Sequence, residues 1–580
     1  VMDYKELYNE WLSNPYFDEE TKEELKAIES DEKEIEDRFY TELEFGTAGL
    51  RGVIGAGTNR MNIYTVRKAT QGLANYIIEM KGQDKGVAIS YDSRHMSPEF
   101  ADEAALCLNA NGIKAYVFES LRPTPELSFA VRELGCIAGI NVTASHNPAE
   151  YNGYKVYWED GAQITPPHDT GIMDAVKAIT DYSTMKTMEK TEAIDKGLYI
   201  TIGKAIDDKY IAAIKTQVKN PDIIKQVQKD IKIVYTPLHG TGNIPVRRVL
   251  KELGFENVYV VKEQEMPDGD FPTVSYPNPE SAEAFELAVK LGNEVEADLL
   301  LATDPDADRL GVYIKGSKPG TYHVLTGNMS GCLLAEYEIS QMKEKGMLPE
   351  DGALVKSIVS TNLANDIAKY YNIDLIEVLT GFKYIGEKML EFETDGNGTY
   401  VFGFEESYGC LIGTHARDKD AIVATMALCE AAAYYKTKGM SLWDKMKEMY
   451  ERYGYWRDGV HAITLKGKEG IEKIQNTLER LRGNVPTTVG HYNVLKVRDY
   501  KLDIITDMQT KEVVPTGLPK SNVLYLELSE EAWVCIRPSG TEPKLKFYYG
   551  VKGKNFDDAD EKLEALGNYM KDMINAMLND

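Results

Sequence analysis

Short apolar runs and amphipathic stretches alternate along most of this chain. The first repeat of the pattern predicts strands at 87–91, 114–118 and 137–142, with helices at 98–111 and 125–134 between them. Apolar, β-branched strands separated by helices of ten or more residues are typical of βαβ units and of a largely parallel sheet. The pattern therefore predicts an α/β fold.

The same alternation returns twice further along the chain. It predicts strands at 232–235, 258–261, 298–302, 354–359, 375–378 and 400–404, and helices at 244–253, 281–291 and 362–371. After Tyr455 the pattern changes to short strands at 460–465 and 545–551, with helices at 471–481 and from Asp557 onward, which is typical of an α+β arrangement. Before Arg38, acidic and basic residues alternate at helical spacing and predict a solvent-exposed helical extension packed on the body of the protein.

Three α/β units followed by an α+β segment predict four domains. A chain of 580 residues is long enough for this, because domains usually contain about 100–200 residues. We predict three related mixed α/β-sheet domains and a C-terminal α+β domain around a central cleft. The expected ranges are 1–204, 205–327, 328–455 and 456–580.

The composition is that of a soluble globular protein, with 43% hydrophobic and 27% charged residues. A net charge of −26 repels nucleic acid and anionic lipid, so we expect neither a nucleic-acid nor a membrane partner. The six cysteines form no C-x-x-C pair, and no secretory signal is visible at the N-terminus. We therefore expect a cytoplasmic protein without a disulfide framework or structural zinc, as a monomer or weak homodimer.

A reactive hydroxyl is predicted in the segment from Thr143 to Pro148, which reads T-A-S-H-N-P. Ser145 follows an apolar strand, and open α/β folds bind ligands at the carboxyl ends of their strands. Taken alone, the segment could be a turn held by its own polar side chains, but three further polar motifs favour a nucleophile. A Ser-His-Asp hydrolase is disfavoured, because adjacent residues rarely form a nucleophile–base pair and no G-x-S-x-G sequence is present.

A metal site is predicted in the sequence D-P-D-A-D-R. In an extended chain every second side chain points to the same side, so Asp304, Asp306 and Asp308 would project together. Three crowded carboxylates need a cation, and an all-oxygen ligand set favours Mg²⁺ over the alternative of a solvated acidic turn. The loop lacks the glycine and the ligating glutamate of an EF-hand. Arg309 would hold the carboxylates or contact a phosphoryl oxygen.

Two further motifs would bind the substrate. The sequence G-F-E-E-S follows a predicted strand, and its Glu405 and Ser407 could bridge neighbouring sugar hydroxyls. A glycosidase would also use two carboxylates, but it would need neither a metal loop nor a phosphate clamp. The sequence R-P-S-G-T-E-P offers a guanidinium, two hydroxyls and flexible backbone N–H groups, which suit a phosphate dianion better than an ordinary turn. Its residues are Arg537, Ser539, Gly540 and Thr541.

Other cationic side chains could balance the charge of the substrate. They are Arg51, Arg94, Lys155, Lys383, Arg417 and Lys419. Most lysines and arginines on a surface only face solvent, so each is a weak candidate by itself. Lys155 is the strongest, because it lies ten residues after Ser145 across a predicted hairpin, and a lysine with a lowered pKa can act as a general acid or base.

With these four motifs in order, the chain from about Thr41 to its C-terminus resembles the α-D-phosphohexomutase family, and within it the phosphoglucomutase branch. The resemblance implies a four-domain enzyme whose Ser145 is phosphorylated in the resting state. It also implies Mg²⁺ held by a phosphoserine oxygen and by Asp304, Asp306 and Asp308. Arg51 and Arg94 match family positions that line the catalytic region.

The resemblance implies an intramolecular phosphotransferase that interconverts glucose 1-phosphate and glucose 6-phosphate. The phosphoserine would give its phosphoryl group to the sugar, and the intermediate, glucose 1,6-bisphosphate, would turn around in the cleft and return its other phosphate to Ser145. Lys155 or His146 would handle the hydroxyl proton. The same resemblance assigns sugar recognition to Glu405 and Ser407, and the distal phosphate to Arg537, Ser539, Gly540 and Thr541.

Some features are similar to a longer-chain branch whose members include phosphopentomutases. These are the extension before Thr41 and the additional Phe404, while Pro305 stands where the family often has Gly. The G-F-E-E-S loop resembles glucose-type loops more than the G-E-M-S loop associated with mannose phosphate. Glucose phosphate is therefore the expected substrate, with mannose or pentose phosphate as the alternative. A non-catalytic sugar-phosphate-binding protein is an alternative of a different class, although all the catalytic residues are present.

Overall fold

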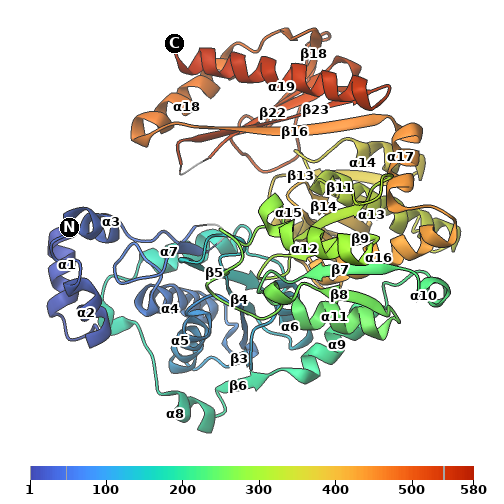
Figure 1. Ribbon diagram of the computed structural model, residues 1–580. Coiled ribbons are helices and arrows are strands. Elements are labelled where there is room, and N and C mark those ends of the chain that lie inside the picture. Colours follow the sequence, from blue (N-terminus) through green and yellow to red (C-terminus); the bar gives the residue numbers. More distant parts are fainter. Residues whose placement is uncertain (1, 47–48, 540–541) are drawn as a thin grey trace. The chain divides into compact units, whose positions relative to one another are not determined.

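The computed structural model describes residues 2–46, 49–539 and 542–580 (Figure 1). The chain divides into two compact units. The first contains the residues up to Gly327 together with Phe382–Gly403 and Ser407–Ser441. The second contains Asn328–Gly381, Phe404–Glu406 and Leu442–Asp580.

Short helices form the N-terminal part of the first unit. They are α1 (Tyr4–Ser13), α2 (Glu19–Lys26) and α3 (Glu32–Phe39). Each follows an aspartate, Asp3, Asp18 or Asp31, whose carboxylate accepts a hydrogen bond from a backbone N–H of the first turn. Trp11, Phe17 and Phe39 pack with Tyr64 of α4 (Ile63–Glu79) in one apolar cluster. The prediction of a helical extension packed on the body is confirmed.

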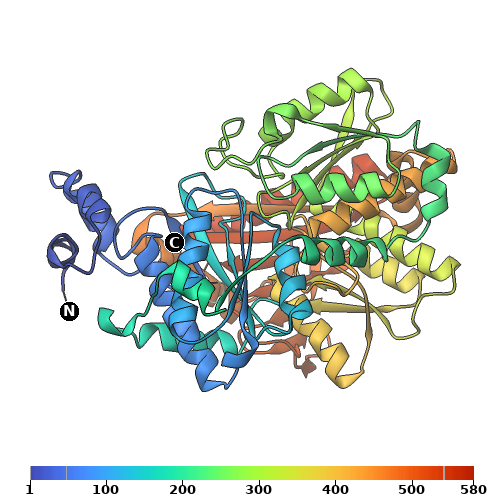
Figure 2. The same cartoon turned by 90° about the horizontal axis from the view of Figure 1, so that it is seen from below.

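The first sheet is mixed and has the strand order β1-β5-β4-β2-β3-β6. β2 (Val87–Tyr91) is parallel to β3 (Ala115–Phe118) and β4 (Ala138–Val142), and β3 is parallel to β6 (Tyr199–Ile202). β5 (Tyr151–Trp158) is antiparallel to β4 and to β1 (Leu50–Val53). Helices lie on both sides of this sheet (Figure 2). They are α4, α5 (Ser97–Ala110), α6 (Thr124–Glu133), α7 (His168–Lys177) and α8 (Lys190–Asp195).

The second sheet has the order β11-β10-β9-β7-β8. β7 (Lys232–Thr236) is parallel to β8 (Asn257–Val260) and β9 (Leu299–Thr303). β10 (Leu310–Lys315) is antiparallel to β9 and to β11 (Tyr322–Leu325), so the D-P-D-A-D-R segment connects β9 to β10. The helices of this region are α9 (Lys204–Lys215), α10 (Pro221–Val227), α11 (Asn243–Glu252) and α12 (Ala282–Val295).

The first unit also contains a later stretch of the chain. Its elements are α15 (Phe382–Asp395), most of β14 (Thr399–Glu405), β15 (Gly409–Ile412) and α16 (Ala421–Thr437). Asp420 caps α16, because its carboxylate accepts hydrogen bonds from the N–H groups of Ile422 and Val423. These bonds fix the N-terminus of α16.

The second unit combines a short α/β segment with the C-terminal domain. The α/β segment comprises α13 (Gly327–Glu344), α14 (Leu363–Tyr370), and the parallel strands β12 (Gly352–Ser357) and β13 (Asp374–Val378). The C-terminal sheet has the order β16-β23-β22-β21-β18-β19-β20, and β17 pairs with β18. Helix α19 covers one face of this sheet (Figure 1).

The remaining boundaries belong mostly to that C-terminal region. The strands are β16 (Tyr455–Thr464), β17 (Thr488–Val489), β18 (Tyr492–Asp499), β19 (Ile504–Asp507), β20 (Val513–Val514), β21 (Leu524–Leu528), β22 (Trp533–Pro538) and β23 (Lys544–Gly553). The helices are α17 (Leu442–Tyr453), α18 (Gly467–Gly483) and α19 (Phe556–Leu578). Short 3-10 turns lie at Gln83–Lys85, Tyr182–Thr184, Lys262–Gln264 and Ser529–Glu531.

Each of the six cysteines is buried and free, so none forms a disulfide. Among the described residues we find no helix that is both long and apolar enough to cross a membrane.

Candidate active site

The loop that carries Ser145 connects β4 to β5. Ser145 has a φ of 53°, in the left-handed region that residues other than glycine seldom adopt. Its backbone N–H donates to Thr143 Oγ1 at 2.9 Å, and the Thr143 hydroxyl donates to Asp92 Oδ2 at 2.6 Å. This chain of hydrogen bonds holds the tight turn at the carboxyl end of β4.

Arg94 holds the same loop from inside the first domain. Its guanidinium donates, at 2.6–3.2 Å, to the carbonyl oxygens of Ser145, Asn147, Pro148 and Tyr151. The side chain is completely buried, and its Nε lies 3.5 Å from Asp92 Oδ2. We expected Arg94 to contact substrate. The structure directs its donors to the protein's own backbone instead.

Lys155 reaches the Ser145 hydroxyl from β5. It lies opposite Asn141 of β4 in the antiparallel hairpin, and its Nζ donates to Ser145 Oγ at 2.9 Å. Ser145 Oγ in turn donates to Asp306 Oδ2 at 3.4 Å, and Lys155 Nζ lies 3.8 Å from the same oxygen. The predicted nucleophile, the predicted lysine and the predicted metal loop therefore meet at one point.

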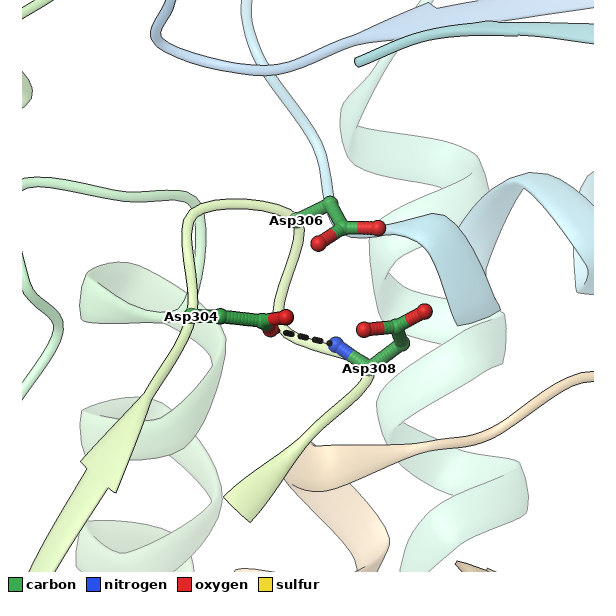
Figure 3. Close-up of side chains that lie close together, drawn as sticks. All are labelled: Asp304, Asp306 and Asp308. Atoms are coloured by element: carbon green, nitrogen blue, oxygen red, sulfur yellow. Dashed lines mark hydrogen bonds between the residues drawn. The ribbon is translucent and has the colours of Figure 1, made fainter. Parts of the chain in front are cut away.

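The metal loop is a turn. Ala307 has a φ of 51°, and its N–H donates to Asp304 O at 2.9 Å. Asp304 Oδ1 accepts hydrogen bonds from the N–H groups of Asp308 and Arg309, at 3.2 Å each. Carboxylate oxygens of Asp304, Asp306 and Asp308 lie within 4.8 Å of one another (Figure 3). The three carboxylates do converge, but our reason, alternation along an extended chain, is wrong, because the turn brings them together.

The chemistry of these carboxylates fits a divalent cation. Asp304 Oδ2, Asp306 Oδ1 and Asp308 Oδ1 are buried and have no hydrogen-bond partner among the residues that the structure describes. Burial and the neighbouring carboxylates raise the pKa of Asp304, and they raise the pKa of Asp306 to about 6. Burial would also raise the pKa of Asp308, but Lys419 and other cations outweigh it and lower that pKa. A cation that prefers oxygen ligands, such as Mg²⁺, would satisfy the three oxygens and remove the repulsion between them.

Consecutive carbonyl oxygens of the metal loop are each fixed by a different part of the chain. The bonds run from Thr241 N–H and O–H to Pro305 O, from Thr124 N–H to Asp306 O, and from Ala421 N–H to Ala307 O, at 2.7–3.1 Å. Thr124 begins α6, Thr241 follows β7 and Ala421 begins α16. Sequence reasoning missed these supports, because no local pattern links residues so far apart in the chain.

A glycine allows one of these supports to approach. A Cβ atom at Gly240 would lie 2.5 Å from the Cα of Pro305, so a larger residue would push Thr241 away from the loop. The two residues before it, Leu238 and His239, have φ values of 46° and 59°. The backbone thus adopts two uncommon conformations in succession to place Thr241 against Pro305.

Cationic side chains surround the carboxylates. Lys419 Nζ lies 3.4 Å from Asp308 Oδ2 and 3.3 Å from Asp418 Oδ1. Arg309 Nη1 donates to Ser407 O at 3.2 Å. Arg51 lies on β1 opposite Gly153, with the metal-loop carboxylates among its electrostatic neighbours. These cations would offset the negative charge of the carboxylates and of a phosphate bound beside them.

His146, the residue after the predicted nucleophile, is half-buried. Burial, with a further contribution from Arg309, lowers its pKa to about 3, so the imidazole is neutral near pH 7. Its Nδ1 has no hydrogen-bond partner in the described part of the chain.

Two of the predicted cations lie against other groups. Arg417 is buried, and its guanidinium pairs with Glu393 and donates to Thr414 O at 3.4 Å. Lys383, on α15, lies over the ring of Tyr384 at 5.3 Å, and burial lowers its pKa. Neither contact involves the carboxylates of the metal loop.

The predicted sugar-recognition residues lie at the end of β14 and just after it. Glu405 is buried in the second unit, where its Oε1 accepts a hydrogen bond from the Gly381 N–H at 2.9 Å. Ser407 belongs to the first unit, and its carbonyl oxygen is the group that accepts from Arg309. One carboxylate oxygen of Glu405 is therefore already used by the protein backbone.

The predicted phosphate clamp lies in the second unit, between β22 and β23. Arg537 is on β22, and the Ser539 N–H donates to Lys544 O at 2.8 Å across the hairpin. Gly540 and Thr541 lie outside the described residues.

Three models of one protein family match this chain. Models of the phosphoglucomutase/phosphomannomutase alpha/beta/alpha domains I, II and III match residues 42–183, 208–317 and 326–453, respectively. The chain therefore belongs to the phosphoglucomutase/phosphomannomutase family, a group of phosphomutase enzymes. Its fold is that of the family, three α/β/α domains followed by a C-terminal domain, as predicted.

Individual relatives match almost from end to end. A phosphoglucomutase of Staphylococcus epidermidis is 37% identical over 541 residues, which cover 92% of this chain and 94% of that protein. A phosphoglucomutase of Staphylococcus saprophyticus is 34% identical over 569 residues, 98% of this chain and 99% of that protein. The open form of the Paramecium phosphoglucomutase pp63/parafusin has a TM-score of 0.69 at 17% identity, covering 93% of this chain and 95% of that chain. The last likeness shows a shared fold.

Proposed function

We propose that this protein is a phosphoglucomutase that interconverts α-D-glucose 1-phosphate and glucose 6-phosphate. The observation that carries the proposal is the contact of Ser145 Oγ with Lys155 Nζ at 2.9 Å, beside a triad of buried aspartates. The full-length relatives that are named phosphoglucomutase support glucose phosphate as the substrate.

We propose that the resting enzyme carries a phosphoryl group on Ser145 and requires Mg²⁺. Asp304, Asp306 and Asp308 would hold the cation together with a phosphoserine oxygen, because each offers a carboxylate oxygen without another partner among the described residues. When bound, the cation supplies positive charge that stabilises the phosphoryl group during transfer.

In the first half-reaction, a sugar hydroxyl oxygen bonds to the phosphorus as the bond from phosphorus to Ser145 Oγ breaks. The electron pair of the broken bond stays on Oγ, where Lys155 Nζ is placed to donate a proton. Neutral His146 would take the proton that the sugar hydroxyl releases. The product is glucose 1,6-bisphosphate, which also serves as activator of an unphosphorylated enzyme. The second half-reaction transfers the other phosphoryl group to Ser145 by the same steps in reverse.

The remaining candidates would bind the substrate or its phosphates. Arg51, Arg309 and Lys419 are supported by their positions around the aspartates. Lys383, Glu405, Ser407 and Arg417 stay as proposed sugar-phosphate ligands, and Arg537, Ser539, Gly540 and Thr541 as the proposed phosphate clamp. For Arg94 we propose a positioning role, since its donors bind loop carbonyls.

A coupled assay tests the proposal. Formation of glucose 6-phosphate from glucose 1-phosphate is followed with Mg²⁺ and catalytic glucose 1,6-bisphosphate, and mannose 1-phosphate and ribose 1-phosphate are tested with their own product readouts. A clear preference for glucose phosphate is expected. Preference for mannose or pentose phosphate would keep the phosphomutase and overturn the substrate. No turnover of any of them by folded, metal-loaded protein would favour a non-catalytic sugar-phosphate-binding protein.

A further inference from the structure

Thr124, the first residue of α6, contacts Asp306 of the metal loop through two groups. Its backbone N–H donates to Asp306 O at 2.8 Å, and its hydroxyl donates to Asp306 Oδ2 at 2.8 Å. Both residues are completely buried. One threonine therefore fixes the backbone and the side chain of the same predicted metal ligand, from a helix that lies 182 residues away in the chain.

The direction of the hydroxyl bond is set by a series of buried groups. The Ser90 hydroxyl donates to Asn141 Oδ1 at 3.0 Å, and Asn141 Nδ2 donates to Thr124 Oγ1 at 2.6 Å. Because Thr124 Oγ1 already accepts from the asparagine, its own proton is available for Asp306 Oδ2, which can only accept when ionised. The Ser90–Asn141–Thr124 series thus makes the Thr124 hydroxyl a hydrogen-bond donor to Asp306 Oδ2.

This arrangement separates the two oxygens of Asp306 by function. Oδ2 accepts from Thr124 and lies near Ser145 and Lys155, while Oδ1 is buried without a partner among the described residues. We propose that Thr124 is a positioning residue that turns Oδ1 of Asp306 toward the cation. The inference rests on the metal site of the proposed function and adds a residue of α6 to it. Groups that hydrogen-bond a metal ligand orient it and tune its affinity for the ion.

Thr241 provides a matched comparison. Its N–H and hydroxyl also bind the metal loop, but both donate to the carbonyl oxygen of Pro305, which is not a predicted ligand. Both threonines are buried and each gives two hydrogen bonds to the loop. Loss of the Thr241 hydroxyl should loosen the loop about as much as loss of the Thr124 hydroxyl, without freeing a carboxylate.

The test compares Thr124→Val, Thr124→Ser and Thr241→Val in the full-length protein, with Mn²⁺ as the probe. Free Mn²⁺ is measured by electron paramagnetic resonance, after mass spectrometry has shown equal phosphorylation of the variants. We expect Thr124→Val to weaken Mn²⁺ binding by about 10- to 100-fold, the range for residues that support a metal ligand. Thr124→Ser, which keeps the hydroxyl, should restore the affinity, and Thr241→Val should lose much less affinity for Mn²⁺ than Thr124→Val.

Turnover gives a second readout. Raising the Mg²⁺ concentration should recover much of the activity that Thr124→Val loses, whereas damage to the fold would not respond to the ion. Circular dichroism identifies a variant that has not folded, in which case Thr124→Ser and Thr124→Ala are compared instead. Equal Mn²⁺ affinity in folded Thr124→Val and wild type would overturn the positioning role alone. Absence of Mn²⁺ binding by the wild type would overturn the metal site, and the inference with it.

Discussion

The serine loop and the metal loop are both strained turns, but different parts of the chain hold them in place. Each contains a residue other than glycine with a positive φ, Ser145 at 53° and Ala307 at 51°, and each relies on hydrogen bonds to its own carbonyl oxygens. The serine loop takes these bonds from Arg94, within the same domain. The metal loop takes them from α6, from the segment after β7 and from the start of α16.

The two loops differ in how much of the protein must fold before each can take its shape. The hydrogen bonds that hold the backbone of the serine loop come from the first domain, so this backbone can form when that domain folds. The metal loop gains its supports only when two helices and the turn after β7, from three stretches of the chain, have packed around it. The shape of the loop around the predicted nucleophile is therefore set mainly within one domain, whereas the shape of the predicted cation site depends on packing across the first unit.

The largest expected effect comes from removing the nucleophile. Ser145→Ala should lower kcat by roughly 10⁴-fold or more, as expected when a covalent nucleophile is lost, and leave the fold intact. The coupled assay measures the first and circular dichroism the second, with the exposed Ser183→Ala as control. Normal turnover by Ser145→Ala would show that another residue carries the phosphoryl group.

The second largest effect is expected from removing the cation that we propose for the metal loop. A chelator should lower turnover by about 10³-fold, because several kcal/mol of charge stabilisation are lost, and added Mg²⁺ should restore it. Phosphate on Ser145, measured by mass spectrometry, should survive the treatment. Chelator already saturated with Mg²⁺ is the control, and full activity of the metal-free protein would contradict the proposed metal requirement.

Arg94→Lys should weaken the serine loop and leave the metal loop unchanged. A lysine keeps the charge but has three donors in place of the guanidinium fork, so the carbonyls of the serine loop lose part of their support. We expect kcat to fall by about 100-fold, as when a reacting group is displaced by about 1 Å, and the free energy of unfolding by about 2–3 kcal/mol.

Affinity for Mn²⁺ is the discriminating measurement for that variant. It should stay near the wild-type value, the opposite of the pattern expected for Thr124→Val. The partly exposed Arg247→Lys is a matched control on the surface. Equal losses of Mn²⁺ affinity in Arg94→Lys and Thr124→Val would mean that the two loops are not independent.

The smallest expected effect concerns Glu126 in α6, the helix that begins with Thr124. Burial and the neighbouring Asp207 raise the pKa of Glu126 well above its ordinary value. A carboxyl group with a raised pKa in the folded state stabilises the protein at pH below its ordinary pKa, and this stabilisation is lost as pH rises through the raised value. Glu126→Gln should therefore gain thermal stability relative to the wild type as pH rises.

Thermal unfolding at several pH values measures this effect. We expect Glu126→Gln to unfold a few degrees above the wild type at about pH 8 and to lose that advantage near pH 4. The exposed Glu99→Gln should follow the wild type at every pH. An identical pH dependence of Glu126→Gln and the wild type would contradict the raised pKa.

Periodicity along the chain was enough to predict about half of the strands and helices that the structure describes. β2 has the predicted bounds, Val87–Tyr91, and β7 begins at the predicted Lys232, because each strand is a continuous apolar run between polar segments. The pattern did not identify α4, whose buried positions include polar residues such as Thr70 and Gln71. The four domain ranges remain predictions.

The site was predictable as a set of residues and less so as a geometry. Ser145, Lys155 and the three aspartates were predicted from local motifs and lie together. The left-handed residue that makes the aspartates converge, Ala307, carries no sequence signal, since alanine favours other conformations. Thr124 was not predicted, because its partner lies in another domain, and Arg94 was assigned to substrate since a charge alone does not reveal burial against carbonyl oxygens.

The left-handed backbone at Ser145 also limits which amino acids evolution can place there. Threonine carries a hydroxyl of similar reactivity, but its branched Cβ is poorly tolerated at positive φ, at a cost on the order of 1–3 kcal/mol. Threonine at this position would distort the loop, so its hydroxyl would not be held where the serine hydroxyl lies. Steric selection on the main chain would therefore reserve the position of the proposed phosphoryl carrier for serine.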